Sequence, residues 1–79
     1  MPAKQIHDPG YRQLVATLKA TRKAQGLTQA QVAARLGVCR TWVSKVESCE
    51  VGLDLLGLIR LCRVYGLKTA TAVEAMEKA

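Results

Sequence analysis

The charged residues of this chain are distributed very unevenly, and their pattern suits the binding of phosphate groups. The 38 residues between Asp8 and Glu47 contain no acid, yet they include seven Lys and Arg residues. The whole chain has 79 residues and a formal charge of +6 at pH 7. A one-sided positive field of this kind favours an acidic partner, such as nucleic acid or an anionic membrane surface. A solvated surface is the alternative interpretation, although such surfaces usually mix both signs of charge.

Catalytic and metal-binding residues do not occur in recognisable arrangements. The chain has no Ser–His–acid set, no glycine-rich phosphate loop and no cluster of carboxylates. Its three cysteines, at positions 39, 49 and 62, are widely spaced, and the single His7 is distant from them. Zinc sites require closely spaced thiolates or imidazoles. We therefore expect no enzyme, no metal and no cofactor, and the odd number of cysteines indicates free thiols in a reducing compartment.

Composition restricts the chain to one small domain with an aliphatic core. Hydrophobic residues make up 49% of the chain, whereas aromatic residues make up 4% and Phe is absent. This apolar content argues against disorder, and no uncharged apolar run reaches the roughly 18 residues that a membrane span needs. Residues 1–10 are polar, contain two prolines and resemble no signal peptide. We expect a flexible arm at 1–8, a folded domain at 9–79 and a cytoplasmic location.

Helix signals recur from Pro9 onward and predict an all-α domain of five helices. In the first helix, apolar residues recur at spacings of three and four between Tyr11 and Leu18, and Gly26 ends the helix. The second helix, 29–36, begins at Thr28, where Gln31 three residues later completes a capping box.

The remaining helices are indicated by weaker or single signals. The third helix follows Cys39, a poor capping residue, and the fourth runs from the Asp54 cap to about residue 65. Gly66 closes the fourth helix, and Thr69 is the expected cap of a short fifth helix.

Residues 29–46 have the pattern of two short helices joined by a tight turn. The first helix presents a small residue, Ala33, where the two helices must approach closely, and Gly37 supplies the positive φ of the turn. Five aliphatic positions attach both helices to the rest of the domain: Val32, Leu36, Val38, Val43 and Val46. The outer face of the second helix then carries four polar residues: Arg40, Thr41, Ser44 and Lys45.

These segments resemble the bacterial and phage Cro/repressor-type helix-turn-helix family, often called the Xre family. The resemblance is carried by GLTQAQVAARLGV, RTWVSKVES and LDLLGLIRLCRVYGL, and it is strongest over residues 11–67. It implies a lambda-repressor-like DNA-binding fold. Two positions depart from the family pattern, because Cys39 stands where Ser or Thr is usual and Cys49 where Gly usually follows Glu-Ser.

The resemblance also implies roles for individual residues. Base edges in the major groove would be read by Arg40, Thr41, Ser44 and Lys45. The DNA phosphates would be bound by Gln29 and Ser48, and Arg22 would form an internal salt bridge with Glu47. The chemistry of these side chains agrees, since Arg binds guanine through two hydrogen bonds and Lys does so less rigidly. The alternatives are a solvated helix face for Arg40 and Lys45, and a phosphate contact for Arg22.

The fourth helix contains more apolar residues than one buried face requires. Eight of the eleven positions from 55 to 65 are apolar or aromatic. Either the fifth helix or a second subunit must cover the excess. We expect a homodimer, because two-fold symmetry would place two recognition helices one DNA turn apart. The expected interface residues are Leu56, Ile59, Val64, Val73 and Met76.

Two functions are consistent with these features. The first is sequence-specific binding of double-stranded DNA at a palindromic operator by a small transcriptional regulator, a repressor or autoregulator. The alternative is an antitoxin-type module that neutralises a toxin partner and also binds DNA. The role of Trp42 stays open between packing inside the domain, stacking on the DNA backbone and contact with a partner protein.

Overall fold

Five helices make up most of residues 6–78, which are the residues that the computed structural model describes. The helices are α1 (Pro9–Ala24), α2 (Gln29–Leu36), α3 (Arg40–Glu47), α4 (Leu55–Tyr65) and α5 (Thr69–Glu77). No strand occurs within this described range. The predicted all-α fold of five helices is therefore confirmed.

Side chains cap the N-termini of α1, α2 and α4. Asp8 accepts a hydrogen bond from a first-turn N–H of α1 at 2.9 Å, and Asp54 does the same for α4 at 2.7 Å. At α2 the capping box is complete. The Gln31 N–H donates to Thr28 Oγ1 at 3.1 Å, and the Thr28 N–H donates to Gln31 Oε1 at 2.8 Å. Caps of this kind each stabilise a helix by about 0.5–2 kcal/mol, which explains why these three helices begin where the sequence indicates.

Left-handed glycines end α2 and α4 and allow the chain to reverse direction. Gly37 has a φ of 71° and Gly66 a φ of 64°. A residue with a Cβ would be strained in this conformation, and glycine is not. The first helix ends at Ala24 with Gln25 as its C-cap, and the next residue, Gly26, has a φ of 71°, so the predicted end of this helix at Gly26 is confirmed.

The start of α5 differs from the prediction. Lys68 is the N-cap residue, because its backbone is extended (φ −68°, ψ 133°), and its side chain makes no capping hydrogen bond. Thr69 is already the first helical residue. Its side chain lies near the thiol of Cys62 in α4, whose pKa is raised by burial and lowered to a smaller extent by Thr69. The expected Thr69 cap is therefore wrong.

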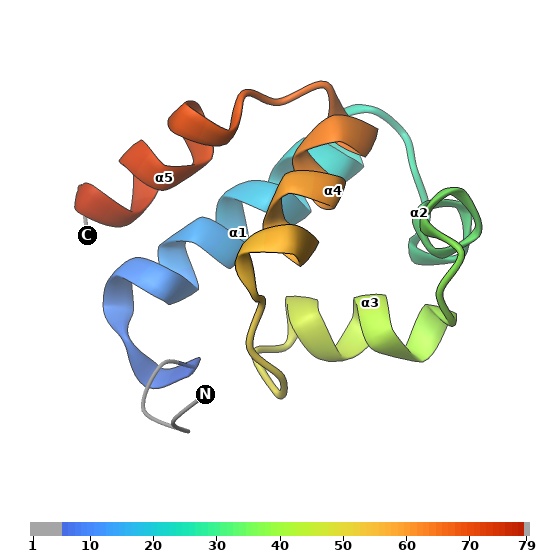
Figure 1. Cartoon of the computed structure of the whole chain (residues 1–79), viewed down its shortest axis with the longest axis horizontal. Coiled ribbons are helices and arrows are strands. Elements are labelled where there is room, and N and C mark those ends of the chain that lie inside the picture. Colours follow the sequence, from blue (N-terminus) through green and yellow to red (C-terminus); the bar gives the residue numbers. More distant parts are fainter. Residues whose placement is uncertain (1–5, 79) are drawn as a thin grey trace.

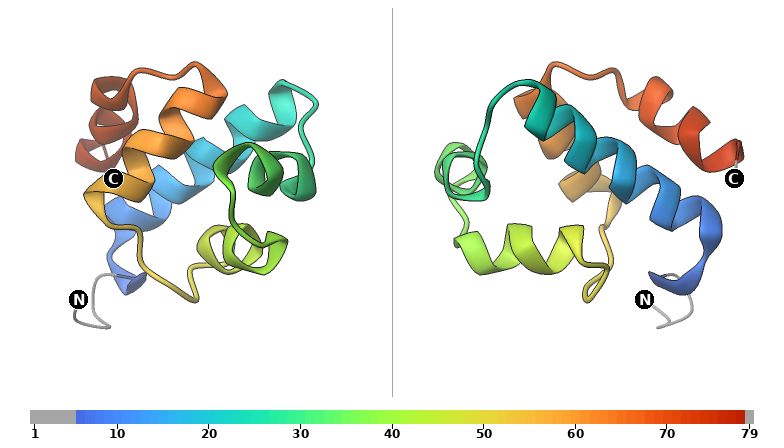
Figure 2. Two further views of the ribbon diagram at one scale, coloured as in Figure 1. Left: turned by 45° about the vertical axis from the view of Figure 1, so that its right-hand side comes forward. Right: turned by 180° about the vertical axis from the view of Figure 1, so that it is seen from behind.

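Three helices pack on α1, which lies along α5 and also contacts α3 and α4, whereas α2 packs on α3 and α4. Figure 1 shows α2 and α3 together at one side of the molecule and α5 at the opposite side, and the reverse view in Figure 2 shows α1 and α5 side by side. The core is aliphatic apart from two buried tyrosines and two buried cysteines. Its members on the first three helices are Tyr11, Leu14, Val15, Leu18, Val32, Ala33, Val43 and Val46, and those beyond α3 are Cys49, Leu53, Leu58, Leu61, Cys62, Tyr65 and Ala72.

The expected flexible arm at 1–8 stays a prediction, and the structure describes only its last three residues. Residues 1–5 lie outside the described residues. Ile6 and His7 form a short 3₁₀ turn, and Ile6 packs against the core. Asp8, the last residue of the expected arm, caps α1.

None of the helices described between residues 6 and 78 has the length and apolarity needed to cross a membrane.

Candidate nucleic-acid interface

The third helix divides its residues between the core and solvent. Val43 and Val46 are buried, at 1% and 2% exposure. The expected base-reading residues lie elsewhere on the helix: Arg40, Thr41 and Lys45 are exposed and Ser44 is half-buried. The structure therefore gathers two cations and two hydroxyls on one short helix. These side chains can donate hydrogen bonds to phosphates and to acceptor atoms on base edges.

The angle between α2 and α3 is held by close contact at the turn. Val32 is fully buried and Ala33 is 3% exposed, so α2 presents little side chain where α3 crosses it. The Val38 N–H donates to the carbonyl of Ala33 at 3.0 Å, which ties the turn after Gly37 to α2. The two helices therefore form a rigid pair that presents α3 at the surface.

A buried ion pair fixes the end of α3 to α1. Arg22 Nε donates to Glu47 Oε2 at 2.6 Å, and Arg22 Nη2 donates to Glu47 Oε1 at 3.0 Å. The side chains are only 8% and 7% exposed. Arg22 Nη1 also donates to the carbonyl of Leu27 at 2.7 Å. The bond to Glu47 raises the pKa of the Arg22 guanidinium despite its burial, so the pair stays ionised. The structure thus contains the pair that the family resemblance implies.

Gln29 is joined to the same ion pair. Its Nε2 donates to Glu47 Oε1 at 3.0 Å, across 18 residues of sequence. An amide nitrogen carries two hydrogens, so one remains for an outside acceptor such as phosphate. The backbone N–H groups of Gln29 and Ala30, in the first turn of α2, also have no acceptor among the described residues. Sequence reasoning missed the bond to Glu47, and no local signal could have revealed it.

Ser48 lies beside an acid that the sequence analysis overlooked. Its Oγ is 2.6 Å from Glu50 Oε2 and 3.2 Å from the carbonyl oxygen of Lys45. The hydroxyl proton is therefore engaged within the chain, and a carboxylate there repels phosphate. A contact of Ser48 with DNA would require this bond to open. The position of Glu50 two residues after Ser48 was the signal in the sequence that could have revealed this contact.

The loop after α3 passes through a strained residue. Cys49 has a φ of 61° and is 9% exposed, so a cysteine holds the backbone conformation that favours glycine. The loop is anchored by the buried Tyr11, whose phenol donates to the carbonyl of Val51 at 3.3 Å and accepts from the Leu53 N–H at 3.0 Å. Burial raises the pKa of Tyr11.

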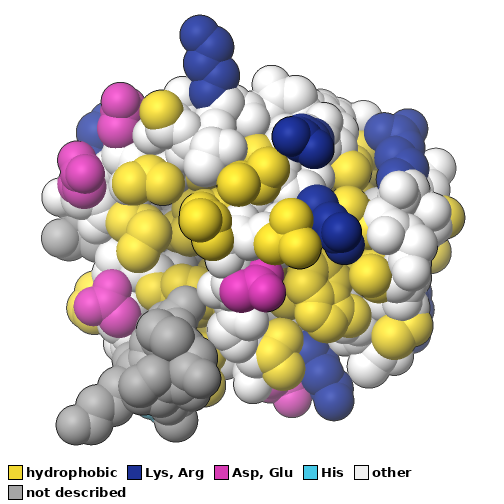
Figure 3. Space-filling model, in the orientation of Figure 1, with side chains coloured by type: hydrophobic (Ala, Val, Ile, Leu, Met, Phe, Trp, Pro, Cys, Tyr) yellow, Lys and Arg dark blue, Asp and Glu magenta, His cyan; other side chains and the backbone are white. Residues whose placement is uncertain are grey.

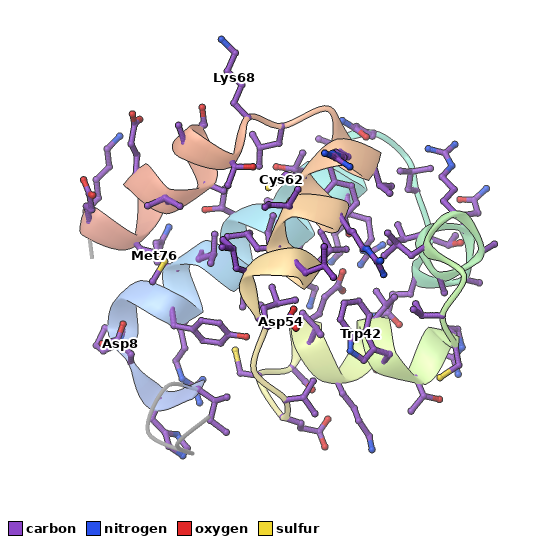
Figure 4. The ribbon with its side chains drawn as sticks, in the orientation of Figure 1. Asp8, Trp42, Asp54, Cys62, Lys68 and Met76 are labelled. Atoms are coloured by element: carbon purple, nitrogen blue, oxygen red, sulfur yellow. The ribbon has the colours of Figure 1, made fainter. Side chains whose placement is uncertain are left out.

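Trp42 projects from α3 toward the first turn of α4 (Figure 4). The residue is half-buried and packs against the core. Its Cζ2 atom lies 3.7 Å from the position that a Cβ on Gly57 would occupy. Of the three alternatives for Trp42, the structure favours packing inside the domain, and part of the ring also lines a hollow next to α4.

The expected interface residues are exposed to very different degrees. Leu56 is 55% exposed and Val73 is 37% exposed, whereas Ile59, Val64 and Met76 are half-buried. Met76 points from α5 toward α1 (Figure 4). The structure therefore does not bring all five residues onto one open face. Sequence reasoning also missed Leu55, which at 70% is the most exposed large hydrophobic residue in the described part of the chain.

Comparisons with known proteins agree with this geometry. Residues 13–76 match a family model described as a helix-turn-helix domain. No curated protein matches the sequence. Among solved structures, the chain is similar to an XRE-family like protein from Pseudomonas syringae pv. tomato str. DC3000, with a TM-score of 0.84 and 36% sequence identity. The similarity covers 95% of this chain and 92% of that chain.

Proposed function

We propose that this chain, which belongs to the helix-turn-helix family and has an Xre-type fold, binds one operator sequence as a homodimer and represses transcription. The family and the fold support its general function as a DNA-binding regulator. Repression of its own gene is included in this proposal. The protein acts in the cytoplasm, without catalysis, metal or cofactor.

The outer face of α3 is the observation that supports the proposal most directly. Arg40, Thr41 and Lys45 are exposed there, and the acid at the end of the helix, Glu47, is turned inward to Arg22. The face therefore offers hydrogen-bond donors and positive charge without a competing carboxylate at its centre. A short helix of this kind fits the major groove, which is about 12 Å wide. Arg40 and Lys45 would read guanine, while Thr41 and Ser44 would contact neighbouring bases.

Phosphate contacts would flank the base-reading face. Gln29 would donate its second amide hydrogen and its backbone N–H to one phosphate, which the positive end of the α2 dipole also favours. Ser48 would bind a second phosphate after its hydroxyl turns away from Glu50. These contacts position the protein equally on every DNA sequence, and the specificity comes from α3.

A homodimer would double this surface and match a palindromic operator. Two recognition helices about 34 Å apart would enter successive major grooves on one side of the duplex. The proposed interface draws on the expected apolar residues of α4 and α5, of which Leu56 and Val73 are exposed and the others half-buried: Leu56, Ile59, Val64, Val73 and Met76.

The antitoxin-type function is the second candidate. It is favoured by one observation, the hollow between Trp42 and the first turn of α4, which lies away from the outer face of α3 and could receive another protein. Purification of the protein from its native host would distinguish the candidates. A toxin held in stable complex would support this second function, whereas purification with DNA alone would support the first.

Selection of bound sequences from a random double-stranded pool tests the proposed function. The wild-type protein should enrich one palindromic sequence. Arg40→Ala should weaken binding to that sequence by about 1–3 kcal/mol and relax the preference at one base pair. Arg63→Ala on α4 is a matched control, because Arg63 is also exposed and lies outside the proposed interface. Enrichment of no sequence, or equal losses by both variants, would contradict the proposal.

A further inference from the structure

The first turn of α4 forms an exposed apolar ridge. Leu55 and Leu56 are 70% and 55% exposed, and they are the two most exposed large hydrophobic residues among those described. Both follow directly after Asp54, which caps the helix, so their positions are fixed by the cap. Adjacent exposed leucines on a rigid element are typical of a surface that contacts another protein.

A hollow of about 320 Å³ lies directly beside Leu56. Its apolar lining comes from the α2–α3 turn and from α3, through Leu36, Val38 and Trp42. In the orientation of Figure 1, the space-filling view shows apolar side chains gathered over this part of the surface, interrupted by individual charges (Figure 3). The exposed side chain of Leu56 and an apolar hollow therefore lie next to each other on one face of the molecule.

The hollow also carries one acid and one base. Asp54 and Arg60 both line it, and both are exposed. No salt bridge joins them within the described chain. Asp54 lies three residues before Gly57, and Arg60 lies three residues after it. If two copies of α4 lay antiparallel with their Gly57 residues together, each Arg60 would face the Asp54 of the other copy.

We infer that a second copy of this chain docks on this hollow, about a two-fold axis that crosses α4 near Gly57. Leu56 of each copy enters the hollow of the other and packs against Trp42, and Arg60 of each copy pairs with Asp54 of the other. This surface carries both an exposed leucine and the hollow that would receive it, and both an acid and a base. It is therefore complementary to a second copy of itself, as an isologous interface must be. This inference rests on the proposed homodimer and narrows its interface to α4 and α3, with Val73 and Met76 outside it.

The arrangement has a consequence for DNA binding. Trp42 belongs to α3, so the partner would press on the inner side of the same helix whose outer side carries Arg40 and Lys45. None of the expected base-reading residues lines the hollow. Docking therefore leaves the outer face open, and it fixes the separation of the two recognition helices through direct contact with each of them.

The oligomeric state of point variants tests the inference. In sedimentation equilibrium, Leu56→Asp should raise the dimer dissociation constant by about tenfold or more, because it buries a charge at the centre of the interface. Val73→Asp is the matched control, since Val73 is exposed on α5 and does not line this hollow. Its dissociation constant should stay within about threefold of the parent value. Both positions are exposed, and circular dichroism melts would verify that each variant folds.

The charged contacts need a separate pair of variants. Arg60→Glu would place two acids opposite each other and should weaken the dimer, whereas Arg63→Glu, an exposed arginine outside the hollow, should have little effect. The single tryptophan of the chain gives an independent readout. Its emission should shift to shorter wavelength as the protein concentration rises through the dissociation constant, and this shift should be absent in Leu56→Asp.

The outcomes separate the interface from the proposed function. A dimer that is lost in Val73→Asp and kept in Leu56→Asp would overturn this interface while preserving the homodimer. A stable complex with a different protein that Leu56→Asp abolishes, in a chain that never dimerises, would also overturn it. A parent that stays monomeric at high concentration, alone and on a palindromic operator, would reject both the interface and the proposed homodimer. A Leu56→Asp variant that is monomeric and still binds random DNA as the parent does would support both the interface and the proposed homodimer.

Discussion

The side-chain amide of Gln29 donates to Glu47 Oε1 at 3.0 Å, and this bond joins the first turn of α2 to the last turn of α3. The same oxygen accepts from Arg22 Nη2 at 3.0 Å. One carboxylate therefore holds a proposed phosphate-binding residue, the recognition helix and α1 in a fixed arrangement. Changes at position 47 should affect both the stability of the fold and the orientation of Gln29.

Glu47→Ala should strongly destabilise the domain. The variant leaves the Arg22 guanidinium buried without its acceptor, and breaking a buried pair in this way costs about 3–5 kcal/mol. Denaturant melts followed by circular dichroism would measure the loss. Glu50→Ala is the matched control, because Glu50 is an exposed acid three residues away, and it should change stability by less than about 0.5 kcal/mol. Equal midpoints for Glu47→Ala and the parent would show that the pair contributes little.

Gln29→Ala should weaken binding to the operator and to random DNA by similar factors. The contact proposed for Gln29 is with phosphate, which is present in every sequence. Fluorescence anisotropy titrations at one fixed salt concentration would compare the two affinities, because all such affinities fall steeply with salt. Gln13→Ala, which changes an exposed glutamine on α1, should leave both affinities unchanged. A loss confined to the operator would instead make Gln29 a base-reading residue.

Tyr65 should make the domain less stable in alkaline solution. Burial, with repulsion from the Glu47 carboxylate, raises the pKa of Tyr65 from 10.0 to about 12. The unfolded chain then loses this proton at lower pH than the folded chain, so stability is full below pH 10 and falls as the pH rises toward the folded value. A shift of this size corresponds to about 2–3 kcal/mol.

Urea melts at neutral pH and at a pH between 10.0 and about 12 would measure this loss of stability. Tyr65→Phe should remove the part of the decline that belongs to this phenol, while the decline from Tyr11, whose pKa is also raised, remains. An identical alkaline decline in Tyr65→Phe and the parent would contradict the assignment.

Cys49 should tolerate glycine but not valine. Its left-handed backbone is strained by about 1–2 kcal/mol for a residue with a Cβ, and glycine would relieve this strain. The gain is offset by loss of the buried thiol and by the greater freedom of glycine in the unfolded chain. Cys49→Gly should therefore stay within about 1 kcal/mol of the parent. Cys49→Val should lose about 1–3 kcal/mol, because β-branched residues are rare at positive φ. Thermal melts would compare the stability of the two variants. A Cys49→Val variant as stable as Cys49→Gly would show that the backbone at position 49 is not strained.

The sequence by itself determined the elements of this fold and the pair of helices that carries the candidate site. Asp8, Thr28 and Asp54 mark the starts of three helices, because a capping side chain bonds to an N–H only three residues away. Gly37 marks the turn, since its backbone conformation is a property of the residue itself. The cap of α5 was predicted at the wrong residue, because the extended residue before the helix is Lys68 and Thr69 is already helical.

Only the tertiary structure decided how distant side chains meet. It paired Gln29 with Glu47, turned Trp42 toward α4, and placed the exposed Leu56 beside a hollow formed by other helices. It also buried Met76 partly against α1, where the sequence had suggested a subunit contact. These outcomes depend on the crossing angles of helices and on competition between partners across the chain. Helix periodicity and capping signals act over three or four residues, so they carry no information about crossing angles or about competition between distant partners.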